Sequence, residues 1–340
     1  MRAARLRSAV ITLPLLALAV GSSAVAHAGT PASAPATTAA SSLQRLPAAP
    51  VTLLAGPRST RPTLVAPDRA RTASPDSVSA TTAAGAQFTV TYSGFSPAAR
   101  TAFQRAVDLW AATVQSSVPI TVKASFTPLG RGVLGSAGPS GVYKNFSGAP
   151  QRETWYVDAI ANKRAGRQLD PSPDIVAEFN SSFSNWHFGS AAAPQGTYDF
   201  TSIVLHELGH GLGFLGAGYV AGGVGTVRES GSPISYDRFT ENGAGKALPT
   251  FADRSAALKT QLTGGNLFFD SPAVRDANSA RPARLYAPAT WQDGSSYSHL
   301  AEGTYRAGNR NSLMTPFLSD GETIRSPGPI TKAILTTIGW

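Results

Sequence analysis

The chain has 340 residues, a formal net charge of +9 and no cysteine, which excludes disulfides, thiolate metal ligands and a cysteine nucleophile. Three basic residues, Arg2, Arg5 and Arg7, lie at the start, and from residue 87 onward 21 basic and 18 acidic residues leave a balance of only +3. Most of the charge therefore lies in the N-terminal region. We expect no nucleic-acid partner, because that function calls for a basic stripe on the folded part.

Residues 1–28 are typical of a secretory signal peptide, with a basic start, an apolar run and the small-residue ending Ala26-His27-Ala28. The apolar run, residues 9–20, contains a proline and falls short of the roughly 20 residues that span a bilayer. We therefore expect export from a bacterial cell and a secreted, extracellular protein, with no stable membrane insertion.

Residues 29–85 are predicted to be a disordered leader or propeptide. Of these 57 residues, 38 are Ala, Pro, Ser or Thr, and the first aromatic residue of the chain is Phe88. Such a segment has little apolar surface to offset the entropy of ordering. The composition does not distinguish a passive linker from an inhibitory segment.

The folded domain is predicted to span residues 86–340. Strands are expected at 88–92, 119–126, 153–157 and 174–179, and a helix begins at Ser96-Pro97, a capping residue followed by proline. A short helix is expected at 329–338, ending at Gly339. Residues 217–293 are rich in Gly, Pro, Ser and Asn and are predicted to form a loop-rich insertion.

The segment with the clearest chemistry runs from His206 to Phe214. His206 and His210 are four residues apart, so a helix places both imidazoles on one face, where they can bind one Zn²⁺. Glu207 lies beside them and is placed to act on a water molecule rather than to bind the metal. Gly209 and Gly211 each weaken a helix by roughly 0.5–1 kcal/mol relative to Ala, which indicates that another group approaches closely there.

A catalytic zinc needs a third protein ligand, and the residues alone leave several candidates. The compact zinc-protease pattern would place a histidine at position 216, which is a glycine. His187 lies upstream between two aromatic residues, His299 lies 89 residues beyond His210, and Glu229 lies 19 residues beyond it.

A second motif, Ser312-Leu313-Met314-Thr315-Pro316, follows His299 by about 15 residues. With the His-Glu-x-x-His-x-x-Gly-Phe pattern of residues 206–214, it resembles the leishmanolysin-type metzincins. The resemblance implies an α+β metzincin-like catalytic domain, comprising a twisted sheet, an active-site helix, a Met-turn and a C-terminal helix, with a long insertion before the third zinc ligand. It further implies that His299 is that ligand, that Met314 lies beneath the site, and that Gly213 permits a sharp turn after the helix.

The resemblance also implies a zinc metalloendopeptidase with one catalytic Zn²⁺ that acts on protein or peptide substrates. In this reading zinc activates a water molecule and Glu207 is the general base. We expect one extended strand, residues 174–179, to line the cleft and pair with the substrate backbone. Two alternatives remain: a secreted binding or adhesion module with a structural metal, and a zinc hydrolase acting on a non-peptide bond. The sequence indicates neither substrate preference nor oligomeric state.

Overall fold

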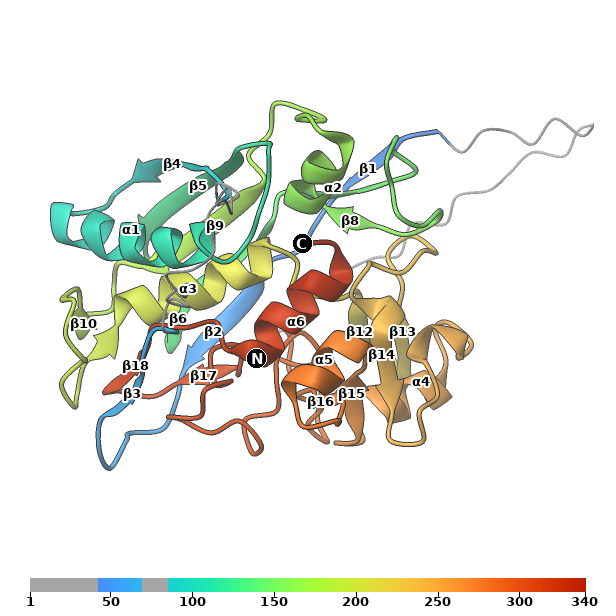
Figure 1. Ribbon diagram of the computed structural model, residues 1–340. Coiled ribbons are helices and arrows are strands. Elements are labelled where there is room, and N and C mark those ends of the chain that lie inside the picture. The colour runs from blue at the N-terminus through green and yellow to red at the C-terminus, as the bar shows by residue number, and fades with distance from the viewer. Residues whose placement is uncertain (1–41, 69–84) are drawn as a thin grey trace, which may run out of the picture. The chain divides into compact units, whose positions relative to one another are not determined.

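The computed structural model describes residues 42–68 and 85–340, so the predicted signal peptide and residues 29–41 and 69–84 of the predicted leader lie outside the described residues. The described part is a mixed α/β structure with several sheets and six α-helices (Figure 1), in keeping with the α+β class. The helices are α1 (Pro97–Ala111), α2 (Asp158–Ala165), α3 (Phe200–Gly211), α4 (Ala256–Leu262), α5 (Pro272–Ala277) and α6 (Pro329–Ile338).

The main sheet has six strands in the order β17-β2-β6-β9-β5-β4. Strands β4, β5 and β9 run parallel, β6 runs antiparallel to β9, β2 is antiparallel to β6, and β17 pairs in parallel with β2. The bounds are β2 (Val51–Ala55), β4 (Phe88–Ser93), β5 (Ile120–Thr127), β6 (Val133–Pro139), β9 (Ile175–Asn180) and β17 (Phe317–Leu318). The strands predicted at 88–92, 119–126 and 174–179 are confirmed as β4, β5 and β9.

The prediction of a disordered leader is wrong for residues 42–68. They contribute β1 (Gln44–Pro47), β2 and β3 (Thr63–Val65), so the folded part begins well before residue 86. Composition missed these strands because pairing uses backbone groups, which no residue count registers. Within β2 the apolar residues Val51 and Leu53 alternate with less buried neighbours, so one face of the strand is buried against the core.

Four small sheets and one hairpin complete the described strands. Strand β1 pairs with β7 (Gly141–Lys144), which pairs with β8 (Tyr156–Val157), and β3 pairs with β18 (Glu322–Ile324). The strand predicted at 153–157 is therefore present only over its last two residues. The remaining pairings are β10 (Trp186–His187) with β11 (Tyr198–Asp199), the hairpin β12 (Gly218–Ala221) and β13 (Val224–Val227), and β14 (Thr240–Asn242), β15 (Leu267–Phe269) and β16 (Ala283–Arg284).

The helices α1 and α3 lie side by side against one face of the main sheet (Figure 1). The side chain of Ser96 caps α1 by accepting a hydrogen bond from the amide of Ala99 at 3.2 Å, as the sequence predicts. Aromatic rings fill the space between helices and sheet, with the centroids of Phe179 and Phe200 5.2 Å apart. This core fixes α3 against strands β6, β9 and β2.

Candidate metal centre

The helix α3 is anchored at its first turn by buried polar contacts. The Asp199 carboxylate caps the helix by accepting from the amide of Ser202 at 2.7 Å, and it also accepts from Arg325 Nη2 at 2.7 Å. Every residue of the helix is buried. A helix held on all sides can present His206 and His210 in fixed positions.

Three buried histidines meet at one point. The Nε2 atom of His210 lies 2.9 Å from that of His206 and 3.2 Å from that of His299, and the Nε2 atoms of His206 and His299 are 3.2 Å apart. Ligands about 2.05 Å from a tetrahedral zinc lie about 3.3 Å from one another. The three side chains are therefore close enough to bind one metal ion.

The other ring nitrogens indicate which atoms would face the metal. The Nδ1 atoms of His206, His210 and His299 lie 2.6, 2.8 and 2.7 Å from the carbonyl oxygens of Leu313, Phe214 and Ser295 respectively. A carbonyl only accepts, so each Nδ1 carries the proton and each Nε2 presents a lone pair. Three converging lone pairs with no proton between them repel one another and fit a bound cation, whose ligands are held in this way by outer hydrogen bonds.

Burial keeps these imidazoles neutral. It lowers the pKa of His206 to about 4 and lowers the pKa values of His210 and His299 well below their ordinary value. Neutral imidazole is the form that binds a metal, so the pocket favours ligation without the competition of protons at neutral pH.

The carboxyl group of Glu207, the residue after His206 in α3, faces the main sheet. It is fully buried, and neither oxygen has a hydrogen-bond partner within the described ranges 42–68 and 85–340. Burial raises its pKa well above the ordinary value, and the nearby amides of Leu53 and Ala137 offset this only in part. A Cβ atom on Gly135 of β6 would lie 3.0 Å from Glu207 Oε1, so this glycine leaves the space that the carboxyl group fills.

Met314 lies beneath the helix, fully buried against Gly209. A Cβ atom at Gly209 would lie 2.8 Å from Met314 Sδ, and one at Gly211 would lie 2.4 Å from Ile175 Cγ2. The close approaches predicted from the two glycines are confirmed. The Met314 carbonyl also accepts from the amide of Leu300 at 2.7 Å, which joins the methionine loop to the residue after His299.

Gly213 follows the helix with a φ of +111°, in the region that favours glycine. A Cβ atom there would lie 3.0 Å from Ile338 Cδ1 of α6, so the position is restricted by both backbone conformation and packing. The predicted turn is present.

The two rival ligands lie elsewhere. His187 belongs to β10, where its Nε2 atom is 3.1 Å from the carbonyl of Ala191, and it is not part of the triad. Glu229 accepts a hydrogen bond from Trp155 Nε1 through its backbone carbonyl and likewise is not in the triad. The predicted pairing of strand 174–179 with a substrate backbone is wrong, since β9 is paired with β6 on one edge and with β5 on the other. Sequence reasoning missed the approach of Leu53 to Glu207, because nothing in the spacing of residues 42–68 pointed to α3.

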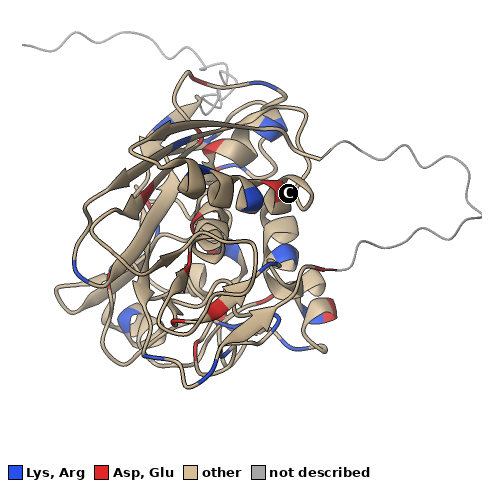
Figure 2. Cartoon of the chain, turned by 90° about the vertical axis from the view of Figure 1, so that its left-hand side faces the viewer, with Lys and Arg blue, Asp and Glu red and all other residues tan. Residues whose placement is uncertain are grey.

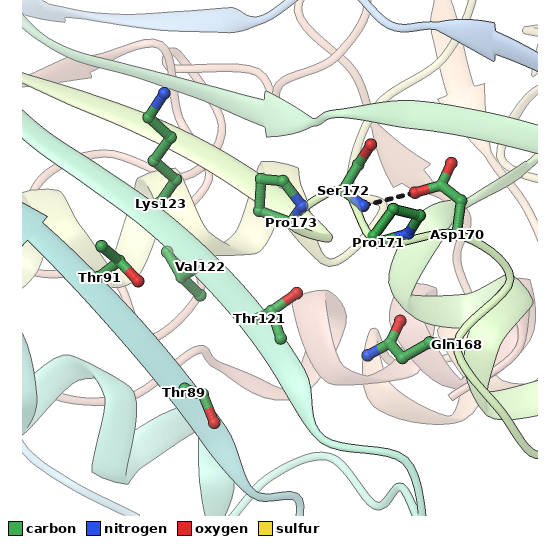
Figure 3. Close-up of a pocket in the computed structure, with 10 residues that line it drawn as sticks. All are labelled: Thr89, Thr91, Thr121, Val122, Lys123, Gln168, Asp170, Pro171, Ser172 and Pro173. Carbon is green, nitrogen blue, oxygen red and sulfur yellow. Dashed lines mark hydrogen bonds between the residues drawn. The ribbon is translucent and has the colours of Figure 1, made fainter.

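Several hollows of the described surface lie away from the triad. Figure 3 shows one of about 400 Å³ beside β4 and β5, lined by threonines, prolines and Lys123, where Asp170 Oδ1 accepts from the amide of Ser172 at 2.7 Å. None of the three histidines lines it. Charged residues of both signs are interspersed over the face in Figure 2.

Within the part of the chain that the structure describes, none of the helices has both the length and the apolar character needed to cross a membrane. Comparison of the chain with protein-family models, with curated proteins and with solved structures gave no match.

Proposed function

We propose that the protein is a secreted zinc-dependent endopeptidase of the leishmanolysin-like metzincin type. One observation carries the proposal: three neutral imidazoles converge through Nε2, and Glu207, the residue after His206, has a buried carboxyl group without a hydrogen-bond partner among the described residues. The metzincin fold, the membership of that family and the export of the chain are parts of the same proposal, supported by the motifs around His206 and Met314.

Zinc is the metal that this donor set favours. Three histidine nitrogens and one open position are typical of catalytic zinc sites, whereas calcium and magnesium prefer oxygen ligands. His206, His210 and His299 would hold the ion. When bound, Zn²⁺ supplies Lewis-acid polarisation of a carbonyl group and acidifies water.

The chain itself supplies the base and its surroundings. Glu207 accepts the proton that a water molecule loses as it attacks a peptide carbonyl, and it returns that proton to the leaving amine. Its buried position raises its pKa above that of an exposed glutamate, which makes the carboxylate a stronger base. The carbonyls of Leu313, Phe214 and Ser295 hold the imidazoles in orientation throughout.

A structural metal site in a binding module is the second candidate, favoured by the complete burial of the three ligands. Glu207 argues against it. A buried carboxyl group without a partner costs free energy, and a purely structural site gains nothing from it.

The test combines metal analysis with digestion of casein by the zinc-loaded chain. Released peptides are identified by mass spectrometry, which registers slow turnover. We expect one zinc per chain, loss of cleavage with a chelator, and a loss of at least 100-fold in Glu207→Gln with zinc retained. Glu229→Gln is the matched control and should cleave as the wild type does. Measurable cleavage by Glu207→Gln at the wild-type rate would refute the assigned mechanism.

A further inference from the structure

Strand β2 occupies a particular place in the main sheet. It comes from residues 42–68, yet it lies between β6 and β17, two strands that do not pair with each other. In β2, Val51 lies opposite Ala137 and Leu53 opposite Gly135 of β6. Without β2, the backbone of β6 that faces it would be an unpaired sheet edge, which is a template for an extended peptide.

On the side opposite β6, β2 contacts segments that lie close in sequence to the metal-centre residues. We call the space that β2 occupies between β6 and these segments the β2 groove. The amide of Thr52 donates to the carbonyl of Gly294 at 3.2 Å, and the amide of Leu54 donates to the carbonyl of Pro316 at 3.2 Å. Gly294 lies five residues before His299, and Pro316 two residues after Met314. These bonds use only backbone atoms of β2, so another extended chain can make them in its place.

The strand also passes directly over the candidate base. Leu53 pairs with Gly135, the residue whose missing Cβ leaves space for Glu207. Side chains of directly opposed residues in an antiparallel pair point to the same face, so Leu53 points with Gly135 toward α3. Its side chain is 1% exposed.

We propose that residues 51–54 occupy the groove in which an extended peptide substrate binds, with Leu53 in the place of an aliphatic substrate residue, so that residues 42–68 hold the site closed. This inference rests on the proposed function, because the proposed protease activity is what identifies a peptide substrate as the other occupant of the groove. The contact differs from a thiolate on the metal, which a chain without cysteine cannot provide.

Contacts on both sides of β2 keep the segment in place. Strand β1 pairs with β7, and Arg45 Nε lies 2.6 Å from Asp170 Oδ2. Strand β3 pairs with β18, and Asp68 forms an ion pair with Lys332. Because these anchors tether β2, it competes with a substrate in solution at a high effective concentration.

The experiment uses the zinc-loaded full chain and the variant Leu53→Asp. Burying a carboxylate at this position disfavours docking of β2, so we expect casein cleavage to rise at least tenfold over the wild type. Leu64→Asp is the matched control, since Leu64 belongs to the same segment but is 56% exposed. It should leave the cleavage rate unchanged. Zinc content and circular dichroism are measured on each variant.

Binding of a labelled synthetic peptide, residues 44–65, tests the groove independently of proteolytic activity. Fluorescence anisotropy should detect binding to Leu53→Asp, with inhibition of its cleavage of casein, and no binding to the wild type. The same peptide carrying Leu53→Asp should not bind. Peptide binding without any cleavage of casein supports the occupied groove and refutes the proposed protease.

The results that would contradict the proposed groove differ from those that would contradict the proposed protease. If folded Leu53→Asp binds no peptide and cleaves no faster than the wild type, β2 is a structural strand and the inference is overturned. If Leu53→Asp does not fold, the double variant Arg45→Ala/Asp68→Asn, which weakens the anchors and leaves β2 intact, replaces it. An unchanged cleavage rate and absence of peptide binding in that double variant overturn the inference equally.

Discussion

Replacing His299 with alanine is the sharpest test of the metal centre, because His299 is the ligand most distant in sequence. Structural zinc sites in small peptides bind with about 10–16 kcal/mol, so an equal share among four ligands is about 2.5–4 kcal/mol. We therefore expect His299→Ala to weaken zinc binding by roughly 10²–10³-fold. The imidazole is fully buried, and its Nδ1–H bond to the Ser295 carbonyl, 2.7 Å long, is lost as well.

The measurement is competition between the protein and a chromophoric zinc chelator at neutral pH, with circular dichroism to verify folding. His187→Ala is the matched control, since this histidine lies in β10 outside the triad. It should bind zinc as the wild type does. A folded His299→Ala protein that binds zinc with wild-type affinity would refute the assignment of His299. If only His187→Ala loses zinc, then His187 is the third ligand instead.

Three further outcomes follow from the packing and titration of the site. Since burial lowers the pKa of His206 to about 4 and the unfolded value is near 6.5, the unfolded chain binds a proton between these values that the folded chain does not. The metal-free protein should therefore lose roughly 3 kcal/mol from this group as the pH falls from about 6.5 to about 4, measured by urea unfolding, and a midpoint independent of pH would contradict this. Met314→Ala should cost about 2–5 kcal/mol and Met314→Leu less than about 1.5 kcal/mol in the same measurement, because the side chain is fully buried; equal costs would show that its volume is not what matters. Gly211→Ala should cost about 1–3 kcal/mol because its Cβ would lie 2.4 Å from Ile175, whereas Gly303→Ala, with open space around it, should be neutral.

The sequence predicted the parts of the site that depend on local geometry. The spacing of His206 and His210 is a property of one helix, and Gly213 carries a backbone conformation that few other residues adopt. These predictions need no knowledge of the rest of the fold. His299 is different, because its place beside α3 depends on the folding of all the residues between.

The position of β2 could not be predicted for a related reason. A strand in a sheet is stabilised by partners distant in the chain, and residues 51–55 show only a short alternation that many loops share. The Ala, Pro, Ser and Thr content is an average over all of residues 29–85. Whether the segment joins the main sheet depends on only five of them, residues 51–55. Composition therefore predicted the wrong state for residues 42–68.

A buried carboxylate explains how His299 reaches the helix. Asp237 is fully buried, and its carboxylate accepts from the amide of Ala217 at 3.0 Å and from the hydroxyl of Tyr297 at 2.6 Å. Ala217 lies soon after α3, and Tyr297 lies two residues before His299. A Cβ atom on Gly218 would lie 2.3 Å from the Tyr297 ring, so the glycine allows that ring to lie against the chain just after Ala217. One buried carboxylate thus hydrogen-bonds to two segments that are far apart in sequence, one just after α3 and one just before His299. These contacts hold the third histidine close to the helix that carries the other two.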